Sequence, residues 1–402
     1  MSDGEGYRVH YAKATYGEEE REAVNEVLDH PERLVGGPYT DEFQKNVSDL
    51  FGKEHGVMVN SGSSANLLAT EILNLPPGTE VITPIVTFST TVAPLVQKGL
   101  VPVFVDVGVG DYLIDIDQVE EAITEDTGAL MIPSLVGNVP NYPRLREIAD
   151  ENDIYLVEDS ADTIGATIGG TPTGEFSDIS TTSFYGSHVI TSFGAGGMVS
   201  VNRDDWMRRL KKLRGWGRSS AAGEPNDLDT RLETELDGTP YDMKFVFDEV
   251  GYNFLTTEAC AAFGVEQVKK LEGFAEARQR NFDDYHSFFS EYDEYFVPPK
   301  QRDDVETCWL AFALTIRDDA PFEREDIVRH LEANRIQTRP LWSGNLLKHP
   351  GFKNIDARLP FDEYPNADTI MRNSLVFGMH QSLTDEDREY VKDTFAEFLE
   401  KQ

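Results

Sequence analysis

Between residues 55 and 201 the chain alternates short apolar runs with amphipathic stretches, and this alternation restricts the fold more than any other feature. The apolar runs are GVMVN, VPVFVDV, ALMIPSL, IYLVED and GGMVSVN, and the amphipathic stretches are SSANLLATEILN, DIDQVEEAI and YPRLREIADEND. Buried runs that alternate with helices predict an α/β fold in which helices cover a mostly parallel sheet. Ligands of such sheets bind beyond the carboxyl ends of the strands.

The pattern changes after this region. Residues 219–242 are polar and charged, which predicts a long excursion or a loop that contacts a partner. Residues 256–289 have helical periodicity, and the last hundred residues mix WLAFALTI, REDIVRHLEANRI, NSLVFGM and a final acidic helix from Thr384. We therefore expect a large α/β domain over 1–290 and a small α+β domain over 291–402.

The composition limits the partners. The chain of 402 residues carries 36 basic and 72 acidic side chains, a net charge of −36, which disfavours nucleic acid and anionic membranes. Such acidity predicts a halophilic host, with an acidic mesophilic protein as the alternative. Two distant cysteines, Cys260 and Cys308, form neither a disulfide framework nor a metal cluster, so no metal is expected. Without a long apolar run or a leader-like N-terminus, we expect a cytoplasmic location.

Three short segments carry candidate chemistry. The turn from Asn60 to Asn66, between an apolar run and a helix, suits an anion at a helix N-terminus, although such turns are also common elsewhere. Asp159 follows the apolar run IYLV and Glu158, and it could either pair with a protonated ring nitrogen or cap a helix. His188 lies in a glycine-rich loop, where a lone histidine can equally be structural.

In their order and spacing, these segments resemble the sugar aminotransferases of the DegT/DnrJ/EryC1/StrS family over nearly the whole chain. The resemblance implies the type I fold of pyridoxal 5′-phosphate (PLP) enzymes, that of aspartate aminotransferase, with PLP or its pyridoxamine form as cofactor. It also implies a homodimer with shared active sites. The implied cofactor contacts are Ser61, Gly62, Ser63, Ala65 and Ser183 at the phosphate, Phe88 on the ring face, Asp159 at the pyridine nitrogen, Asp162 near the ring oxygen, and Asn253 at the neighbouring subunit's phosphate. At the position of Asp162 the family pattern leads us to expect Glu, Gln or His.

The chain departs from the family at the residue that normally bonds to the cofactor. His188 stands where the family has a lysine, and no lysine occurs between Lys98 and Lys211. An imidazole forms no stable Schiff base, but it can move protons near neutral pH. This substitution resembles the nucleotide-sugar 3-dehydratases of the family. Trp216-Gly217-Arg218 is followed directly by Ser219-Ser220-Ala221-Ala222 and not by cysteines, so the subtype with an iron–sulfur cluster is excluded and the GDP-4-keto-6-deoxy-mannose 3-dehydratase subtype is favoured.

The resemblance implies removal of the C3 hydroxyl from a nucleotide-linked 4-keto-6-deoxyhexose, with GDP favoured and glutamate as amino donor. Two alternatives stay open: a sugar aminotransferase with a noncovalent cofactor, and a catalytically silent homologue that binds nucleotide sugar. The implied substrate contacts are Trp216, Arg218, Arg339, Lys348 and His380. For Arg218, Arg339 and Lys348 the alternative is a surface salt bridge, and for His380 it is a role in holding the fold.

Overall fold

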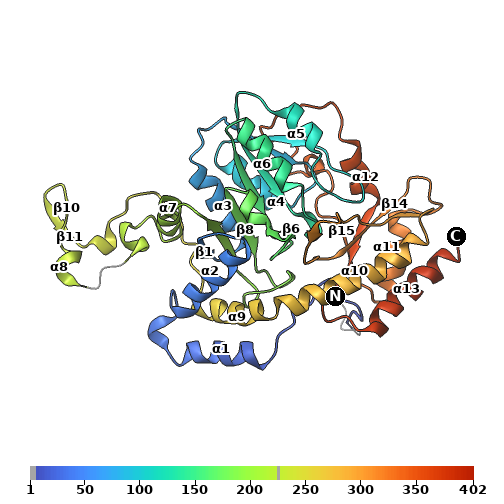
Figure 1. The fold of residues 1–402 in the computed structure, drawn as a ribbon, viewed down its shortest axis with the longest axis horizontal. Coiled ribbons are helices and arrows are strands. Elements are labelled where there is room, and N and C mark those ends of the chain that lie inside the picture. The colour runs from blue at the N-terminus through green and yellow to red at the C-terminus, as the bar shows by residue number, and fades with distance from the viewer. Residues whose placement is uncertain (1–5, 224–226) are drawn as a thin grey trace.

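The computed structural model describes residues 6–223 and 227–402 and centres on a seven-stranded sheet (Figure 1). The strand order is β1-β9-β8-β5-β4-β2-β3, and β9 runs antiparallel to both of its neighbours while the other pairs are parallel. The mostly parallel sheet predicted from the sequence is confirmed. Its strands are β1 (His55–Val59), β2 (Glu80–Pro84), β3 (Val101–Val105), β4 (Thr127–Pro133), β5 (Tyr155–Asp159), β8 (Ile179–Ser183) and β9 (Gly197–Val201).

Helices cover both faces of this sheet. On one face, α3 and α7 pack their apolar residues against a layer that includes Val57, Ala129 and Val157. On the other face, α5 and α6 pack against Leu130 and Leu156. The helices of this part are α1 (Glu18–Leu28), α2 (Pro38–Leu50), α3 (Gly62–Leu73), α4 (Ser89–Gln97), α5 (Ile116–Ala122), α6 (Tyr142–Glu151), α7 (Asp204–Arg214), α9 (Glu258–Lys269) and α10 (Leu271–Ser290).

The strand β8, ISTTS, is unusual because it is polar and yet buried. Its hydroxyls have partners inside the protein: Ser180 Oγ donates to Glu158 Oε2 at 2.8 Å, and Thr182 Oγ1 donates to the carbonyl of Ser160 at 2.8 Å. Buried polar groups are tolerated when they are hydrogen-bonded in this way. The strand therefore needs no apolar side chains in its centre.

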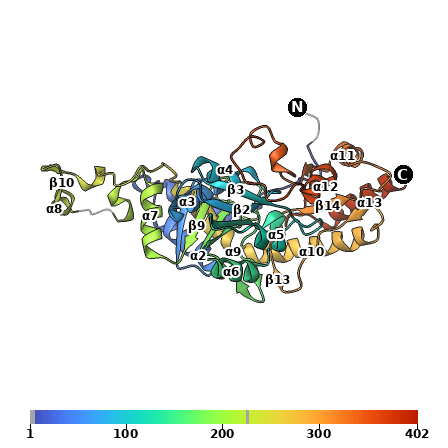
Figure 2. The same cartoon turned by 90° about the horizontal axis from the view of Figure 1, so that it is seen from above.

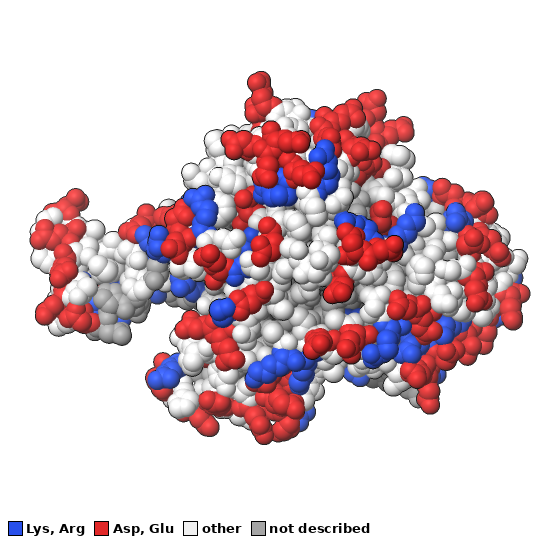
Figure 3. Space-filling view, in the orientation of Figure 1, with Lys and Arg blue, Asp and Glu red and all other residues white. Residues whose placement is uncertain are grey.

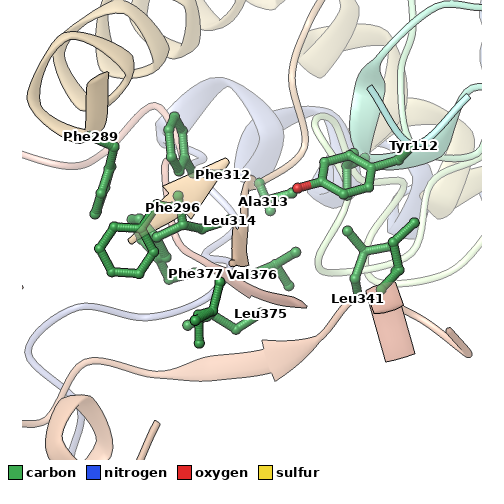
Figure 4. Close-up of a cluster of buried hydrophobic side chains, with 14 of the residues drawn as sticks. Tyr112, Phe289, Phe296, Phe312, Ala313, Leu314, Leu341, Leu375, Val376 and Phe377 are labelled. Atoms are coloured by element: carbon green, nitrogen blue, oxygen red, sulfur yellow. The ribbon is translucent and has the colours of Figure 1, made fainter. Parts of the chain in front are cut away.

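The C-terminal part forms a second, four-stranded antiparallel sheet of order β12-β14-β16-β15. Aromatic side chains fill the space beside it, among them Phe289 from α10 and Phe312 and Phe377 from the sheet (Figure 4). The predicted boundary between a large and a small domain at residue 290 remains a proposal. The last turns of α10, which ends at Ser290, pack into the core of the C-terminal part. The elements are β12 (Phe296–Val297), β14 (Phe312–Ile316), α11 (Arg324–Ala333), β15 (Thr338–Pro340), α12 (Pro365–Asn373), β16 (Ser374–Phe377) and α13 (Asp385–Leu399).

Two smaller sheets complete the chain. The strand β13 (Val305–Glu306) pairs with β6 (Thr167–Ile168), which pairs with β7 (Thr171–Pro172). Figures 1 and 2 both show an arm that projects from the body beyond α7 and carries α8 (Leu228–Arg231), β10 (Thr234–Leu236) and β11 (Thr239–Tyr241). The described residues of the polar segment 219–242 lie in this arm.

Acidic side chains are spread over the visible face, with basic side chains in small groups between them (Figure 3). Many of these form ion pairs, such as Arg388 with Asp284 at 2.8 Å. Within 6–223 and 227–402, no helix has the length and apolar character that a membrane span requires.

Candidate functional site

A cleft of about 710 Å³ lies where β5 and β8 end, between the large sheet and the C-terminal part. No lysine is among the described residues that line it. The cleft brings together nine of the residues predicted from the sequence: Ser61, Gly62, Ser63, Phe88, Asp159, Asp162, Ser183, His188 and Arg339.

The N-terminus of α3 forms one end of the cleft. Ser61 is the N-cap residue, and its Oγ accepts a hydrogen bond from Ser64 N at 3.1 Å. Gly62 is required here because a Cβ atom would lie 2.6 Å from Ser183 Cβ. Free backbone N–H groups and hydroxyls at a helix N-terminus suit a phosphate. Ala65 is buried inside α3 and does not line the cleft.

Asp159 ends β5 and is held in place from three directions. Its Oδ2 accepts hydrogen bonds from Asn66 Nδ2 and Thr91 Oγ1, both at 2.8 Å, and its Oδ1 accepts one from Ala161 N at 3.2 Å. Burial raises the pKa of Asp159, while the bonds from Thr91 and Asn66 oppose this rise. A buried carboxylate without a cation gains from a cationic N–H placed against it. No helix follows Asp159, so the helix-cap alternative is wrong.

Asp162 lies on the same wall of the cleft and is only 7% exposed. Its Oδ2 accepts a hydrogen bond from Val136 N at 2.9 Å. Burial raises the pKa of Asp162 to about 8, and the charge of Asp159 adds to this rise. At neutral pH the carboxyl group is therefore mostly protonated and can donate a hydrogen bond into the cleft.

His188 lies in the loop that joins β8 to β9. Its backbone N–H donates to the carbonyl of Tyr185 at 2.9 Å, and the two rings meet edge to face with centroids 6.3 Å apart. Its Nδ1 is buried and has no hydrogen-bond partner among the described residues. Burial lowers the pKa of the imidazole to about 4, so the ring is neutral at neutral pH and can accept a proton.

The remaining predicted residues do not line this cleft. The guanidinium of Arg218 stacks on Trp216 at 4.4 Å, and Asn253 is exposed beside Gly215. Lys348 pairs with Asp368 at 2.6 Å, which is the predicted salt-bridge alternative. His380 is only 2% exposed and its Nδ1 lies 2.8 Å from Ser382 Oγ, which agrees with a role in holding the fold.

Several lining residues were not predicted from the sequence. They come from three parts of the chain that lie far apart in sequence: the N-terminal segment around residue 11, residue 310 just before β14, and the segment 342–352. Arg339, an implied substrate contact, precedes the last of these segments, but no local signal marks the first. These residues are Tyr11, Leu310, Trp342, Ser343, Leu346, His349 and Phe352.

The fold of the chain is similar to that of solved structures of PLP-dependent sugar enzymes. The chain is similar to the Escherichia coli GDP-4-keto-6-deoxy-D-mannose-3-dehydratase with bound hydrated PLP, with a TM-score of 0.88, 29% identity and coverage of 97% of this chain and 100% of that one. It is also similar to GDP-4-keto-6-deoxymannose-3-dehydratase with a trapped PLP–glutamate geminal diamine, with a TM-score of 0.87, 29% identity and coverage of 96% and 100%. The fold is therefore that of the PLP-dependent aminotransferases.

The chain belongs to the DegT/DnrJ/EryC1/StrS aminotransferase family, whose model matches residues 14–396. It is 38% identical to a dTDP-4-dehydro-2,6-dideoxy-D-glucose 3-dehydratase of Saccharopolyspora spinosa, over 92% of this chain and 82% of that one. It is 31% identical to a GDP-4-keto-6-deoxy-D-mannose 3-dehydratase of Yersinia pseudotuberculosis, over 92% and 93%. These likenesses confirm the predictions of the family, the type I fold, an enzyme and PLP as cofactor.

Proposed function

We propose that the protein is a PLP-dependent 3-dehydratase that removes the C3 hydroxyl of a nucleotide-linked 4-keto-6-deoxyhexose, with glutamate as amino donor. The observation that carries this proposal is a neutral imidazole, His188, in a cleft that no described lysine lines. Without an amine to bond to it, the cofactor is held only by noncovalent contacts. The named activities of the relatives from Saccharopolyspora spinosa and Yersinia pseudotuberculosis support the same reaction.

The cleft residues fit the cofactor. The hydroxyls of Ser61, Ser63 and Ser183 and the N-terminus of α3 would hold its phosphate. Asp159, fixed by its hydrogen bonds, would hold the ring nitrogen in its protonated form. Phe88 is 55% exposed at the cleft and is available to pack on the ring.

When bound in its amine form, the cofactor supplies an amine for the sugar ketone and a ring that takes up electrons. His188, whose lowered pKa keeps the imidazole in its neutral form at neutral pH, removes a proton beside the ring. A lysine at this position would carry that proton on to the sugar carbon and complete an amine transfer. A histidine without that amine favours loss of the hydroxyl instead.

We also propose that two copies share their active sites. Asn253 is exposed and lies outside its own cleft, as expected of a side chain that reaches the phosphate of a neighbour. The arm beyond α7 exposes apolar side chains, including Leu228, Phe247 and Val250, which a second copy would cover. Sedimentation of the protein at micromolar concentration tests this, because a monomer would contradict shared sites.

The proposal also concerns which nucleotide is linked to the sugar. The resemblance found in the sequence favours GDP, whereas the 38% identical relative is named for a dTDP-linked sugar. Incubation with glutamate, PLP and GDP-, CDP- or dTDP-linked 4-keto-6-deoxy sugars, followed by mass spectrometry, tests both points. Loss of the C3 oxygen supports the dehydratase. Gain of nitrogen would indicate an aminotransferase, and unchanged substrate would indicate a silent binder.

A further inference from the structure

We infer that Arg339, backed by the buried Arg278, binds a carboxylate of the amino donor. This inference rests on the proposed function, because it assigns a place in the same cleft to one of the two substrates. It makes Arg339 the residue that holds the carboxylate next to the donor's amine, a role distinct from the nucleotide contact expected from the sequence.

Arg339 presents an uncompensated positive charge to the cleft. It lies on β15, is exposed and lines the cleft, and its Nη1 donates only to the carbonyl of Thr338 at 2.7 Å. Its guanidinium carbon lies 5.7 Å from the ring centroid of Tyr11. No described carboxylate forms an ion pair with it, and Glu332 directs its Oε1 to the N–H and hydroxyl of Thr338 at 2.7 Å.

Arg278 adds a second positive charge behind the wall of the cleft. It is 1% exposed, and its Nη1 donates to the carbonyls of Trp309 at 2.7 Å and Leu310 at 2.8 Å. Its Nε donates to Gln381 Oε1 at 2.9 Å, and no described carboxylate pairs with it. Because Leu310 lines the cleft, this buried cation makes the adjoining wall electropositive. In a chain with a net charge of −36, such a wall attracts an anion.

The position of the charge favours the donor over the nucleotide sugar. An amino acid carries its carboxylate on the carbon next to its amine, so this group must lie close to the reacting atoms beside His188. Arg339 and His188 line the same cleft, and after burial the charge of Arg278 further lowers the pKa of His188. A nucleotide sugar carries its diphosphate at C1, across the ring from its C4 ketone. The planar fork of an arginine suits a carboxylate with two parallel hydrogen bonds.

The test measures binding without turnover, using glutarate as a dicarboxylate that lacks the reactive amine. The PLP-loaded protein is titrated with glutarate, and separately with GDP and dTDP, by calorimetry and by the absorbance of the bound cofactor. Arg339→Gln should raise the Kd of glutarate at least about tenfold, the effect of losing a charge-assisted pair, and leave the Kd of either nucleotide within about twofold. Arg339→Lys should restore part of the affinity.

Arg280→Gln is the matched control, because Arg280 is exposed on α10 and does not line the cleft. It should change none of these affinities. A weaker nucleotide with unchanged glutarate in Arg339→Gln, or no glutarate binding by the unmodified protein, would overturn the inference. Neither result touches the proposed dehydration, which stands or falls on the mass of the sugar product. Circular dichroism of each variant establishes that it is folded.

Discussion

Substitution of Asn66 by alanine should weaken cofactor binding, although Asn66 need not touch the cofactor. Its Nδ2 donates to Asp159 Oδ2 at 2.8 Å, so the change removes one of three hydrogen bonds that stabilise the ionised carboxylate. A hydrogen bond to a charged group contributes about 1.5–3 kcal/mol, and about 1.4 kcal/mol corresponds to a factor of ten. The pKa of Asp159, already raised by burial, should rise further. The ionised carboxylate, which is the form that pairs with a ring N–H, then becomes less stable relative to the protonated form.

The expected result is a rise of roughly ten- to a hundredfold in the Kd of PLP, measured by the absorbance of the bound cofactor at pH 7. Thr91→Ala should act in the same direction, because Thr91 Oγ1 donates to the same oxygen. Asn152→Ala is the control, since the side chain of Asn152 donates to the carbonyl of Ile148 at 2.8 Å and does not line the cleft. An unchanged Kd in both cleft variants would refute the view that these two bonds hold Asp159 for the cofactor.

Three further predictions concern the site, the pH dependence and the surface. His188→Asn should lower the dehydration rate at least about a hundredfold and leave cofactor affinity near normal. Full activity of this variant would remove His188 from the mechanism. His188→Lys should produce the absorbance of a covalently bound cofactor. Burial lowers the pKa of His380 to about 3 from 6.5, so the unfolded chain binds more protons below about pH 6.5. Stability should therefore fall as the pH drops from about 6.5 toward 3, and His380→Gln should flatten this slope in urea unfolding curves; an identical slope would contradict the assignment. If the acidity reflects a halophilic host, the melting temperature should fall as KCl is removed, whereas a flat curve would favour the mesophilic alternative.

Strands and helices that follow a local pattern of apolar residues or a capping residue could be predicted from the sequence. The apolar runs became strands, and the final helix begins after Thr384, which caps α13. The strand β8 could not be predicted from apolar periodicity, because its core is polar and satisfied by Glu158 and by distant backbone. Its burial depends on partners that come from other segments of the chain.

The site residues also divide into those with a local sequence motif and those that only the fold brings together. Asp159 and His188 were predicted because each stands in a recognisable motif. Thr91 and Tyr11 were not, because only the folded chain brings them to Asp159 or to the cleft. Asn66 lies within the predicted phosphate turn, but its role depends on the fold, which brings α3 next to the end of β5 so that Asn66 donates to Asp159. Contacts of this kind leave no trace in spacing or composition.

The reversal of β9 against β8 has a consequence for how such enzymes diversify. Because the connecting loop leaves and re-enters the same edge of the sheet, residue 188 is carried by a short span whose two ends are fixed by the pairing of Ser183 with Gly197. Residue 188 takes part in no strand pairing, so exchange of its side chain leaves the register of β8 and β9 as it is. On the proposed function, one residue in this span separates a covalently held cofactor from a noncovalently held one, while the two strands that carry the span stay the same.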